Sequence, residues 1–255
     1  MKFIDTHTHL YIEDFDHDRD QQINLAIKNG VKKFFLPAID KSYTSRMLNL
    51  KSKYPKNIFL MTGLHPTHIK EDYNEEMEHV KENLNNGGFC AVGEIGVDLY
   101  WNKSNLSIQQ NIFSDQIILA KQNKLPIVIH CRDAFDEVFE VLQDHKSDSL
   151  CGIFHCFTGT IDQAKLAIDY NMKLGIGGVI TFKNGQIDKF IKEISLKSIV
   201  LETDSPYLAP VPYRGKRNQS SYIPLIAEKL AECYGVSVEL IANITTQTAN
   251  SIFNQ

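Results

Sequence analysis

The 255-residue sequence predicts a (β/α)8 barrel. Eight short runs rich in apolar and β-branched residues recur along the chain, and segments with helical patterns separate them. Such alternation predicts a parallel sheet covered by helices, and eight strand–helix units suit a closed barrel. An open doubly wound sheet is the alternative, but no glycine-rich phosphate loop follows the first run.

The elements follow from local patterns. Residues 14–30 begin with acidic side chains and end at Gly30, which predicts the start and the stop of a helix. Residues 108–124 place their apolar side chains on one stripe, and residues 160–171 and 222–235 follow the same pattern. The predicted strands are the apolar runs at 2–5, 31–39, 58–66, 90–98, 125–132, 152–157, 172–182 and 198–206.

Composition describes an ordinary globular protein, with 43% hydrophobic and 23% charged residues. The net charge of -4 provides no overall attraction to nucleic acid, so a polyanion would have to be held by a metal or a small basic patch. We expect no secretory signal, no membrane span, no obligate protein partner and a single domain over residues 1–255. The five cysteines form no C-x-x-C pair, which favours reduced thiols in a cytoplasmic protein.

Metal-type ligands stand where the predicted strands end. They are His7 and His9 after the first strand, His65 after the third, Glu94 in the fourth, His130 in the fifth, His155 in the sixth and Asp204 in the eighth. Barrel enzymes carry their chemistry at this end of the sheet. Any one of these histidines is more often a structural residue than a ligand, but their common position favours a metal site. The other histidines considered, His17, His79 and His145, are interpreted as solvated surface residues.

Strand alternation predicts that His7 and His9 point the same way, and that Glu202 and Asp204 do so too. Four imidazoles and two carboxylates are too many donors for one tetrahedral ion, so we expect two divalent ions that share a carboxylate. The donor set leaves Zn, Mg and Mn open. Two ions about 3.5–4 Å apart activate a water molecule and neutralise charge on the attacked group. Asp204 is suited by type to take the proton from that water.

Seven motifs in the same order give the chain a family resemblance. They are "DTHTHL", "GLHP", "EIGVDLYW", "PIVIHCRDA", "HCFTG", "GGVITFKN" and "LETDSPYLAPVPYRGKRN". Together they strongly resemble the TatD family of metal-dependent deoxyribonucleases, a branch of the amidohydrolase superfamily. The H-x-H motif alone is weak, whereas the block that ends in "PYRGKRN" is highly specific.

The resemblance implies a TIM barrel that hydrolyses phosphodiester bonds, typically as a 3′–5′ exonuclease on single-stranded DNA or DNA 3′ ends; the motifs leave RNA open. In catalysis, Glu94 would bridge the ions, Asp204 would be both ligand and general base, and His65 would lie near the phosphate. Glu202 would orient a ligating histidine. The remaining ligands implied are His7 and His9 for one ion and His130 and His155 for the other.

The basic cluster in "YRGKR" follows the eighth strand, and the resemblance places it near the substrate. Arg214 is the candidate phosphate ligand because guanidinium offers a planar fork, while Lys216 and Arg217 are its companions. Candidates for stacking on an unpaired base are Tyr100, Trp101, Phe157 and Tyr207, with packing at the barrel rim as the alternative. Two alternatives stay open: an amidase or esterase of the same superfamily that acts on a small molecule, and a barrel that binds a partner without catalysis.

Overall fold

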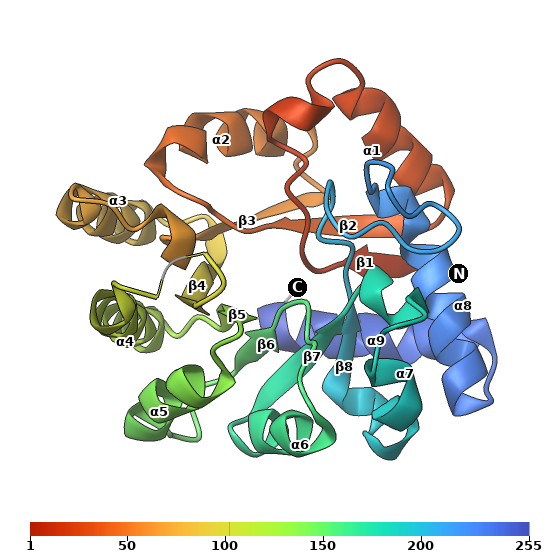
Figure 1. The fold of residues 1–255 in the computed structure, drawn as a ribbon. Helices are drawn as coiled ribbons and strands as arrows, with labels where there is room; N and C mark the ends of the chain where they lie inside the picture. Colours follow the sequence, from red (N-terminus) through yellow and green to blue (C-terminus); the bar gives the residue numbers. More distant parts are fainter. Residues whose placement is uncertain (102, 255) are drawn as a thin grey trace.

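The computed structural model describes residues 1–101 and 103–254, and its centre is a barrel of eight parallel strands (Figure 1). The strands are β1 Phe3–Asp5, β2 Val31–Leu36, β3 Ile58–Thr62, β4 Phe89–Asp98, β5 Ile127–Arg132, β6 Gly152–Phe154, β7 Met172–Ile176 and β8 Ile199–Leu201. They neighbour one another in chain order, which confirms the predicted (β/α)8 fold. The predicted single domain also includes Asn102 and Gln255, which lie outside the described residues.

The seam between β1 and β8 is closed by hydrogen bonds to backbone carbonyl oxygens. The amide and the hydroxyl of Thr6 both donate to the carbonyl oxygen of Leu201, each at 3.0 Å. Beyond the strands, the amide of Asp204 donates to the carbonyl oxygen of His7 at 2.9 Å. The two segments that carry candidate ligands are therefore fixed side by side at the carboxyl end of the barrel.

Helices surround the barrel, and the last one covers its far end. They are α1 Arg19–Lys28, α2 Thr44–Lys53, α3 Tyr73–Asn86, α4 Leu106–Asn123, α5 Phe135–His145, α6 Ile161–Asp169, α7 Ile187–Phe190, α8 Ile223–Tyr234 and α9 Val238–Phe253. In Figure 1, α9 passes behind the barrel. Its Phe253 ring stacks on the inward-facing Phe35 with centroids 4.0 Å apart, within an apolar cluster that includes Ile4 and Val128. This apolar plug leaves the carboxyl end as the polar end of the barrel.

All the predicted strands except the fourth are shorter than the sequence indicated, and the last two differ most. The run at 172–182 is a strand only to Ile176, and a 3-10 turn at Gly178–Thr181 follows. The run at 198–206 is a strand only to Leu201, because Asp204 has a φ of +55°, which an extended strand does not permit. This conformation also means that simple alternation does not describe how Glu202 and Asp204 are oriented.

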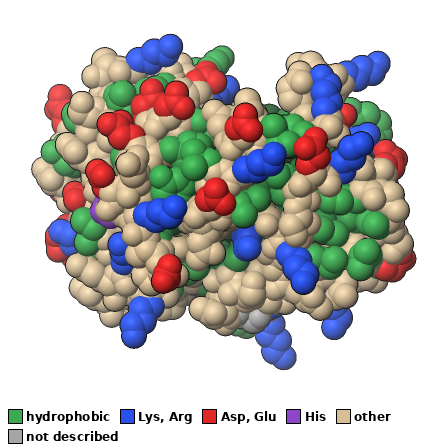
Figure 2. All heavy atoms as spheres, turned by 90° about the horizontal axis from the view of Figure 1, so that it is seen from below, with side chains coloured by type: hydrophobic (Ala, Val, Ile, Leu, Met, Phe, Trp, Pro, Cys, Tyr) green, Lys and Arg blue, Asp and Glu red, His purple; other side chains and the backbone are tan. Residues whose placement is uncertain are grey.

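The surface carries both signs of charge, in keeping with the small net charge. Figure 2 shows one face on which acidic and basic side chains are interspersed with apolar ones. Among the helices formed by the described residues, none has the length and apolar character needed to cross a bilayer.

Candidate metal centre

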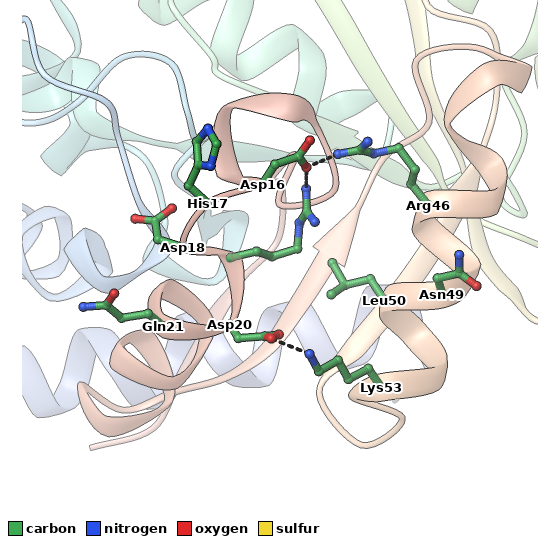
Figure 3. A pocket seen from close by; sticks show the side chains of 10 residues that line it. Asp16, His17, Asp18, Asp20, Gln21, Arg46, Asn49, Leu50 and Lys53 are labelled. Carbon is green, nitrogen blue, oxygen red and sulfur yellow. Dashed lines mark hydrogen bonds and ion pairs between the residues drawn. The ribbon is translucent and has the colours of Figure 1, made fainter.

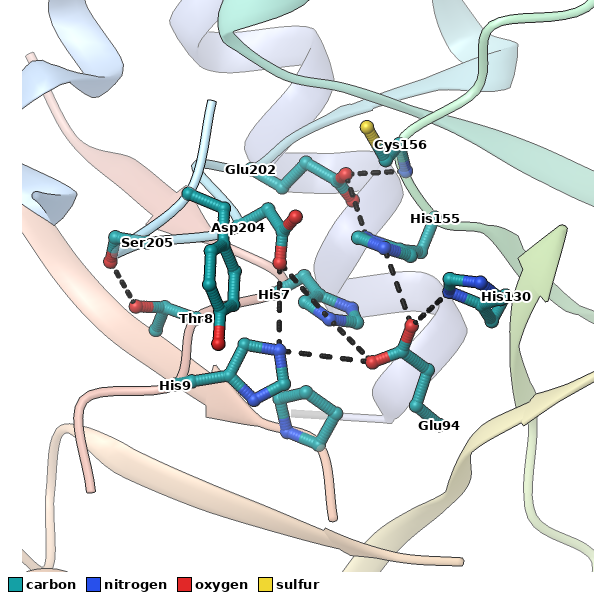
Figure 4. A network of polar contacts seen from close by, with 12 residues as sticks. His7, Thr8, His9, Glu94, His130, His155, Cys156, Glu202, Asp204 and Ser205 are labelled. Carbon is teal, nitrogen blue, oxygen red and sulfur yellow. Dashed lines mark hydrogen bonds and ion pairs between the residues drawn. The ribbon is translucent and has the colours of Figure 1, made fainter. Parts of the chain in front are cut away.

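A cavity of about 720 Å³ opens at the carboxyl ends of the strands, and the predicted ligands meet there (Figure 4). The acidic side chains, histidines and arginine along it are those of His9, His65, His68, Glu94, Asp98, His130, Arg132, His155 and Asp204. His7 is fully buried and lies among them. Residues from β4, β5 and the segments after β1, β3, β6 and β8 thus contribute to one site.

Glu94 is the residue around which the histidines gather. Its Oε2 atom lies 3.1 Å from Nε2 of His7 and 3.8 Å from Nε2 of His9. Its Oε1 atom lies 2.8 Å from Nδ1 of His130 and 3.4 Å from Nε2 of His155. The two oxygens of one carboxylate therefore face different imidazoles, His7 and His9 on one side and His130 and His155 on the other, which suits a carboxylate shared by two cations.

Glycine in β4 allows this carboxylate to reach its partners. Gly96 has a φ of +139°, and a Cβ atom there would overlap the carbonyl oxygen of His130. The pairing of β4 with β5 also shifts register between Gly93 and Ile95. The backbones of β4 and β5 thus approach closely, and Glu94 and His130 become neighbours.

The ring of His9 is oriented by a tyrosine. Its Nδ1 atom lies 2.9 Å from the hydroxyl of Tyr11, and that hydroxyl donates to the carbonyl oxygen of Pro37 at 2.7 Å. The Tyr11 oxygen is therefore left to accept a hydrogen bond from Nδ1–H of His9. The lone pair of His9 is then on Nε2, which faces the site.

Two carboxylates orient two more imidazoles. Oε1 of Glu202 accepts a hydrogen bond from Nδ1 of His155 at 3.1 Å, and Oδ2 of Asp98 accepts one from Nε2 of His130 at 2.8 Å. In each ring the other nitrogen faces Glu94. A carboxylate behind an imidazole is the usual support for a metal-ligating histidine.

His65 differs from these histidines because its ring directs an N–H group, not a lone pair, toward the cavity. Its Nδ1 atom accepts a hydrogen bond from the backbone N–H of Thr67 at 3.1 Å, so in the neutral ring Nε2 carries the hydrogen. That Nε2 lies 3.3 Å from Oε1 of Glu94. His65 therefore offers the cavity a hydrogen-bond donor rather than a lone pair, which suits its predicted place beside a phosphate better than a place among the metal ligands.

The buried ring of His7 tests whether cations fit this site. Its Nδ1 and Nε2 atoms have no hydrogen-bond partner among residues 1–101 and 103–254, although a buried polar atom without a partner is costly. Ligand atoms also converge within 4.8 Å of one another in three groups: His7, His155 and Asp204; His7, His9 and Glu94; His65, Glu94 and His130. The donor set and the unpaired ring fit divalent cations.

The buried carboxylates of the site also stabilise positive charge next to them. Burial disfavours a charged His155, but the three carboxylates around it outweigh that effect and raise its pKa to about 10. These carboxylates are Glu94, Glu202 and Asp204. Burial would raise the pKa of Asp204, yet the surrounding histidines, His155 foremost, hold it below its usual value. The same balance of burial and imidazoles holds the pKa of Glu94 well below its usual value.

Comparison with known proteins identifies the family. A family model described as "TatD related DNase" matches residues 4–254. The chain belongs to the TatD-related DNase family.

Relatives align over nearly the whole chain. The uncharacterized metal-dependent hydrolase YabD of Bacillus subtilis is 37% identical, and the match covers 98% of each chain. The uncharacterized metal-dependent hydrolase YcfH of Escherichia coli is 30% identical over 100% of this chain and 96% of its own. The crystal structure of the TatD homolog YjjV from E. coli superposes with a TM-score of 0.93 at 28% identity and covers 99% of this chain and 98% of its own. This protein is a TatD-family metal-dependent hydrolase.

The basic cluster of this TatD-family chain does not form a single patch at the cavity. Arg214 is exposed, and its guanidinium lies 3.6 Å from the ring centre of Phe182, outside the cavity lining. Arg217 makes two hydrogen bonds to the carboxylate of Asp18, at 2.9 Å and 2.5 Å. The arginine that does line the cavity is Arg132. A role for Arg214 in phosphate binding stays a prediction.

The four aromatic candidates separate into two kinds. Tyr100, Trp101 and Tyr207 are 54%, 69% and 52% exposed, and the last two line the cavity. Phe157 is only 2% exposed and packs on Phe135, with ring centroids 5.5 Å apart. The expectation that Phe157 is available for stacking is therefore wrong, because apolar packing holds its ring in the core.

Asp98 is a functional residue that was not predicted from the sequence. It is the last residue of β4 and lies four positions after Glu94. Strand alternation gives residues 94, 96 and 98 a common face, so the signal was present in the motif "EIGVD". Its partner is His130, which no spacing rule in a single sequence identifies.

The prediction of solvated surface is also wrong for two histidines. His79 is half-buried and lies 2.8 Å from the hydroxyl of Thr44, and half-buried His145 lies 2.7 Å from the hydroxyl of Ser114. Both join neighbouring helices through a hydrogen bond. His17 is exposed, as predicted.

A second cavity, of about 550 Å³, lies outside the barrel beside α1 and α2 (Figure 3). Its charged side chains pair with one another. Arg19 and Arg46 both reach the carboxylate of Asp16, and Lys53 pairs with Asp20. These ion pairs hold the loop after β1 against α2, so this cavity has a structural explanation.

Proposed function

We propose that this protein is a divalent-metal-dependent deoxyribonuclease that shortens single-stranded DNA from its 3′ end. The main support for this proposal is that the two carboxylate oxygens of Glu94 face different imidazoles. Membership of the metal-dependent hydrolases supports the reaction type, and the description of the family model supports DNA as the substrate. RNA is the second candidate substrate, and the cytoplasm is the proposed compartment.

The ligand arrangement follows from the ring nitrogens that face Glu94. The proposed pairs are His7 with His9 for one ion and His130 with His155 for the other, with Glu94 between them and Asp204 as a further ligand. When bound, two such cations lower the pKa of water and offset the negative charge that develops on the attacked phosphate. Zn, Mg and Mn remain candidates, because imidazole and carboxylate accept all three.

The protein's own groups then move the proton and hold the substrate. Oδ1 of Asp204 lies 3.5 Å from Nε2 of His9 and faces the cavity, and its carboxylate is ionised. It takes the proton of the water that attacks phosphorus. Nε2–H of His65 donates to a non-bridging phosphate oxygen. The bond from phosphorus to the 3′ oxygen of the preceding nucleotide breaks, which releases a 5′-mononucleotide. The leaving 3′ oxygen takes a proton from solvent water and becomes the new 3′ hydroxyl.

The test is a panel of single-stranded DNA and RNA, labelled at either end and incubated with Mg²⁺, Mn²⁺ or Zn²⁺. We expect 5′-labelled DNA to shorten as a ladder, and Glu94→Gln to reduce the rate at least a hundredfold. Glu78→Gln, a change at an exposed glutamate of α3, is the matched control and should leave the rate unchanged. Hydrolysis of a cyclic amide or a small ester without cleavage of any nucleic acid would instead support the small-molecule amidase or esterase.

A further inference from the structure

The cavity mouth carries one arginine that the reaction above does not use. Arg132 is the last residue of β5 and lies two residues after His130. It is the only Lys or Arg along the described lining of the cavity, and its guanidinium has no ion-pair partner among the described residues. A permanent cation beside a site for a phosphodiester therefore remains free to bind an anion.

Two aromatic rings hold this guanidinium. Its central carbon lies 3.8 Å from the ring centre of Tyr100 and 5.7 Å from that of Trp101. A guanidinium that stacks on a ring covers one face but keeps its N–H donors, which lie in its own plane. The free edge of Arg132 can thus bind two phosphate oxygens while Tyr100 fixes its orientation.

The indole ring of Trp101 is exposed beside the guanidinium of Arg132. Trp101 is 69% exposed, lines the cavity, and is the only tryptophan in the sequence. Its ring stands nearly perpendicular to that of Tyr100, at 87° with centroids 5.0 Å apart. An indole face next to an anion-binding group is the combination that binds unpaired nucleotides, because every base has a π-face.

A single carboxylate fixes these rings relative to the metal ligands. Oδ1 of Asp98 accepts hydrogen bonds from the backbone N–H groups of Tyr100, at 3.0 Å, and Trp101, at 2.9 Å. Its Oδ2 accepts from Nε2 of His130 at 2.8 Å. Arg132 and His130 are also two residues apart on one strand, which separates their backbones by about 7 Å. The aromatic pair and the arginine are thus fixed relative to His130, beside the candidate metal ligands.

We propose that Arg132, Tyr100 and Trp101 form a nucleotide subsite next to the attacked bond. Arg132 binds the phosphate of the neighbouring nucleotide, and Trp101 stacks on its base. This inference rests on the proposed nuclease function and narrows its substrate to an unpaired strand, since bases inside a duplex stack on one another and leave no face for Trp101. A small phosphate ester lacks both the second phosphate and the base, so the subsite does not contribute to its hydrolysis.

Binding measurements test the arginine without catalysis. A short fluorescein-labelled oligothymidylate with phosphorothioate linkages is titrated with metal-loaded protein, and Kd is followed by anisotropy over a range of salt concentrations. Arg132→Ala should weaken binding about tenfold or more, as loss of a hydrogen-bonded charge does. It should also reduce the slope of log Kd against log salt by about 0.7, the value for one phosphate contact on a single strand. Arg132→Lys should keep the salt slope and recover only part of the affinity.

The matched control is Lys165→Ala, which removes one exposed positive charge from α6, away from the cavity. It should change neither Kd nor the salt slope. An effect as large as that of Arg132→Ala would mean that general electrostatics explain binding, and the subsite would be overturned. Circular dichroism of each variant verifies that it folds.

Fluorescence of the single tryptophan tests stacking directly. The oligothymidylate should quench Trp101 emission, whereas an abasic strand with the same number of phosphates should bind without quenching. Trp101→Ala should weaken binding of the strand with bases about tenfold and leave binding of the abasic strand unchanged. Equal quenching by both strands, or equal weakening, would overturn the role of Trp101.

Kinetics separate this inference from the proposed function. Arg132→Ala should raise KM for oligonucleotides about tenfold but leave hydrolysis of bis(p-nitrophenyl) phosphate within twofold. If the wild-type protein binds the strand through Arg132 but cleaves no DNA with any metal, the nuclease proposal fails and the subsite stands. If it cleaves DNA and Arg132→Ala changes neither Kd nor the salt slope, the nuclease proposal stands and the subsite fails. Equal losses on both substrates would place Arg132 on the attacked phosphate and would also overturn the subsite.

Discussion

The carboxylate of Glu202 occupies the space that a side chain on Gly175 would fill. Glu202 follows β8 and Gly175 lies in β7, so the missing side chain of one strand makes room for an acid from the next. The acid is fully buried, and its Oε1 atom accepts hydrogen bonds from Nδ1 of His155 at 3.1 Å and from the backbone N–H of Cys156 at 2.5 Å. The glycine thus supports the orientation of a candidate metal ligand that it does not touch.

Gly175→Ala is expected to weaken metal binding. Its Cβ atom would overlap Oε2 of Glu202 and displace the carboxylate that orients His155. Loss of such a supporting contact typically reduces metal affinity roughly 10- to 100-fold. Gly177→Ala is the control, because its Cβ would lie 3.6 Å from the nearest atom, the Glu202 carbonyl oxygen. Zinc competition titrations measure both variants, and equal affinities would contradict this account.

Asp98→Asn should weaken metal binding through a different ligand, His130. The amide cannot accept hydrogen bonds with both of its atoms, so it cannot serve both His130 and the backbone of Trp101 as the carboxylate does. We expect a loss of metal affinity of roughly 10- to 100-fold and a change in the emission of Trp101. Asp115→Asn, at an exposed position of α4, is the matched control for calorimetric titration. Retention of both properties in Asp98→Asn would show that the carboxylate charge is not needed.

Metal removal should lower the melting temperature. In the apo site the buried ring nitrogens of His7 make no hydrogen bond to the described residues, although Nε2 lies 3.1 Å from Oε2 of Glu94. Cations that bind only the folded state stabilise it. A metal at 100 times its dissociation constant contributes about 2.7 kcal/mol. For a chain of this size that corresponds to a rise of roughly 5–10 °C. Differential scanning calorimetry with and without a chelator measures the shift. Glu94→Gln should show little of it, and metal content below one ion per wild-type chain after reconstitution would favour a non-catalytic barrel.

The ion pair between Arg217 and Asp18 should contribute to stability in a pH-dependent way. The hydrogen bonds from Arg217 lower the pKa of Asp18 below its ordinary value of 3.8. The stabilisation is therefore complete above pH 3.8 and is lost as the pH falls through the folded-state pKa. Both side chains are about a quarter to a third exposed, so Arg217→Ala should cost only about 1 kcal/mol at neutral pH.

Urea unfolding of Arg217→Ala at pH 7 and below pH 3.8 measures this contribution. The difference from wild type should shrink at the lower pH. The neighbouring exposed residue provides a control, since Lys216→Ala should change the free energy of unfolding by less than about 0.5 kcal/mol at either pH. A difference that stays constant with pH would assign the effect to packing of Arg217 on Phe15 instead.

Much of the fold and the ligand set could be predicted from the sequence, because both depend on local order. Apolar runs alternate with helical segments, which indicates a parallel sheet, and the eight units without a glycine-rich phosphate loop favour a barrel over an open sheet. The candidate ligands His7, Glu94, His130 and Asp204 lie in the carboxyl-terminal halves of strands or just after them, and parallel strands bring these parts together at one end of the barrel. The position of a residue along its strand was therefore sufficient to predict that these side chains share one site.

Only the tertiary structure decided what each side chain does there. Thr67 makes His65 a donor, whereas Asp98 turns His130 toward Glu94. Arg132 and Arg214 have the same chemistry, and neither spacing nor charge indicates that only the first lines the cavity. The physical reason is that hydrogen-bond partners and cavity walls are made by residues distant in the chain, whose contacts depend on how the strands and loops pack.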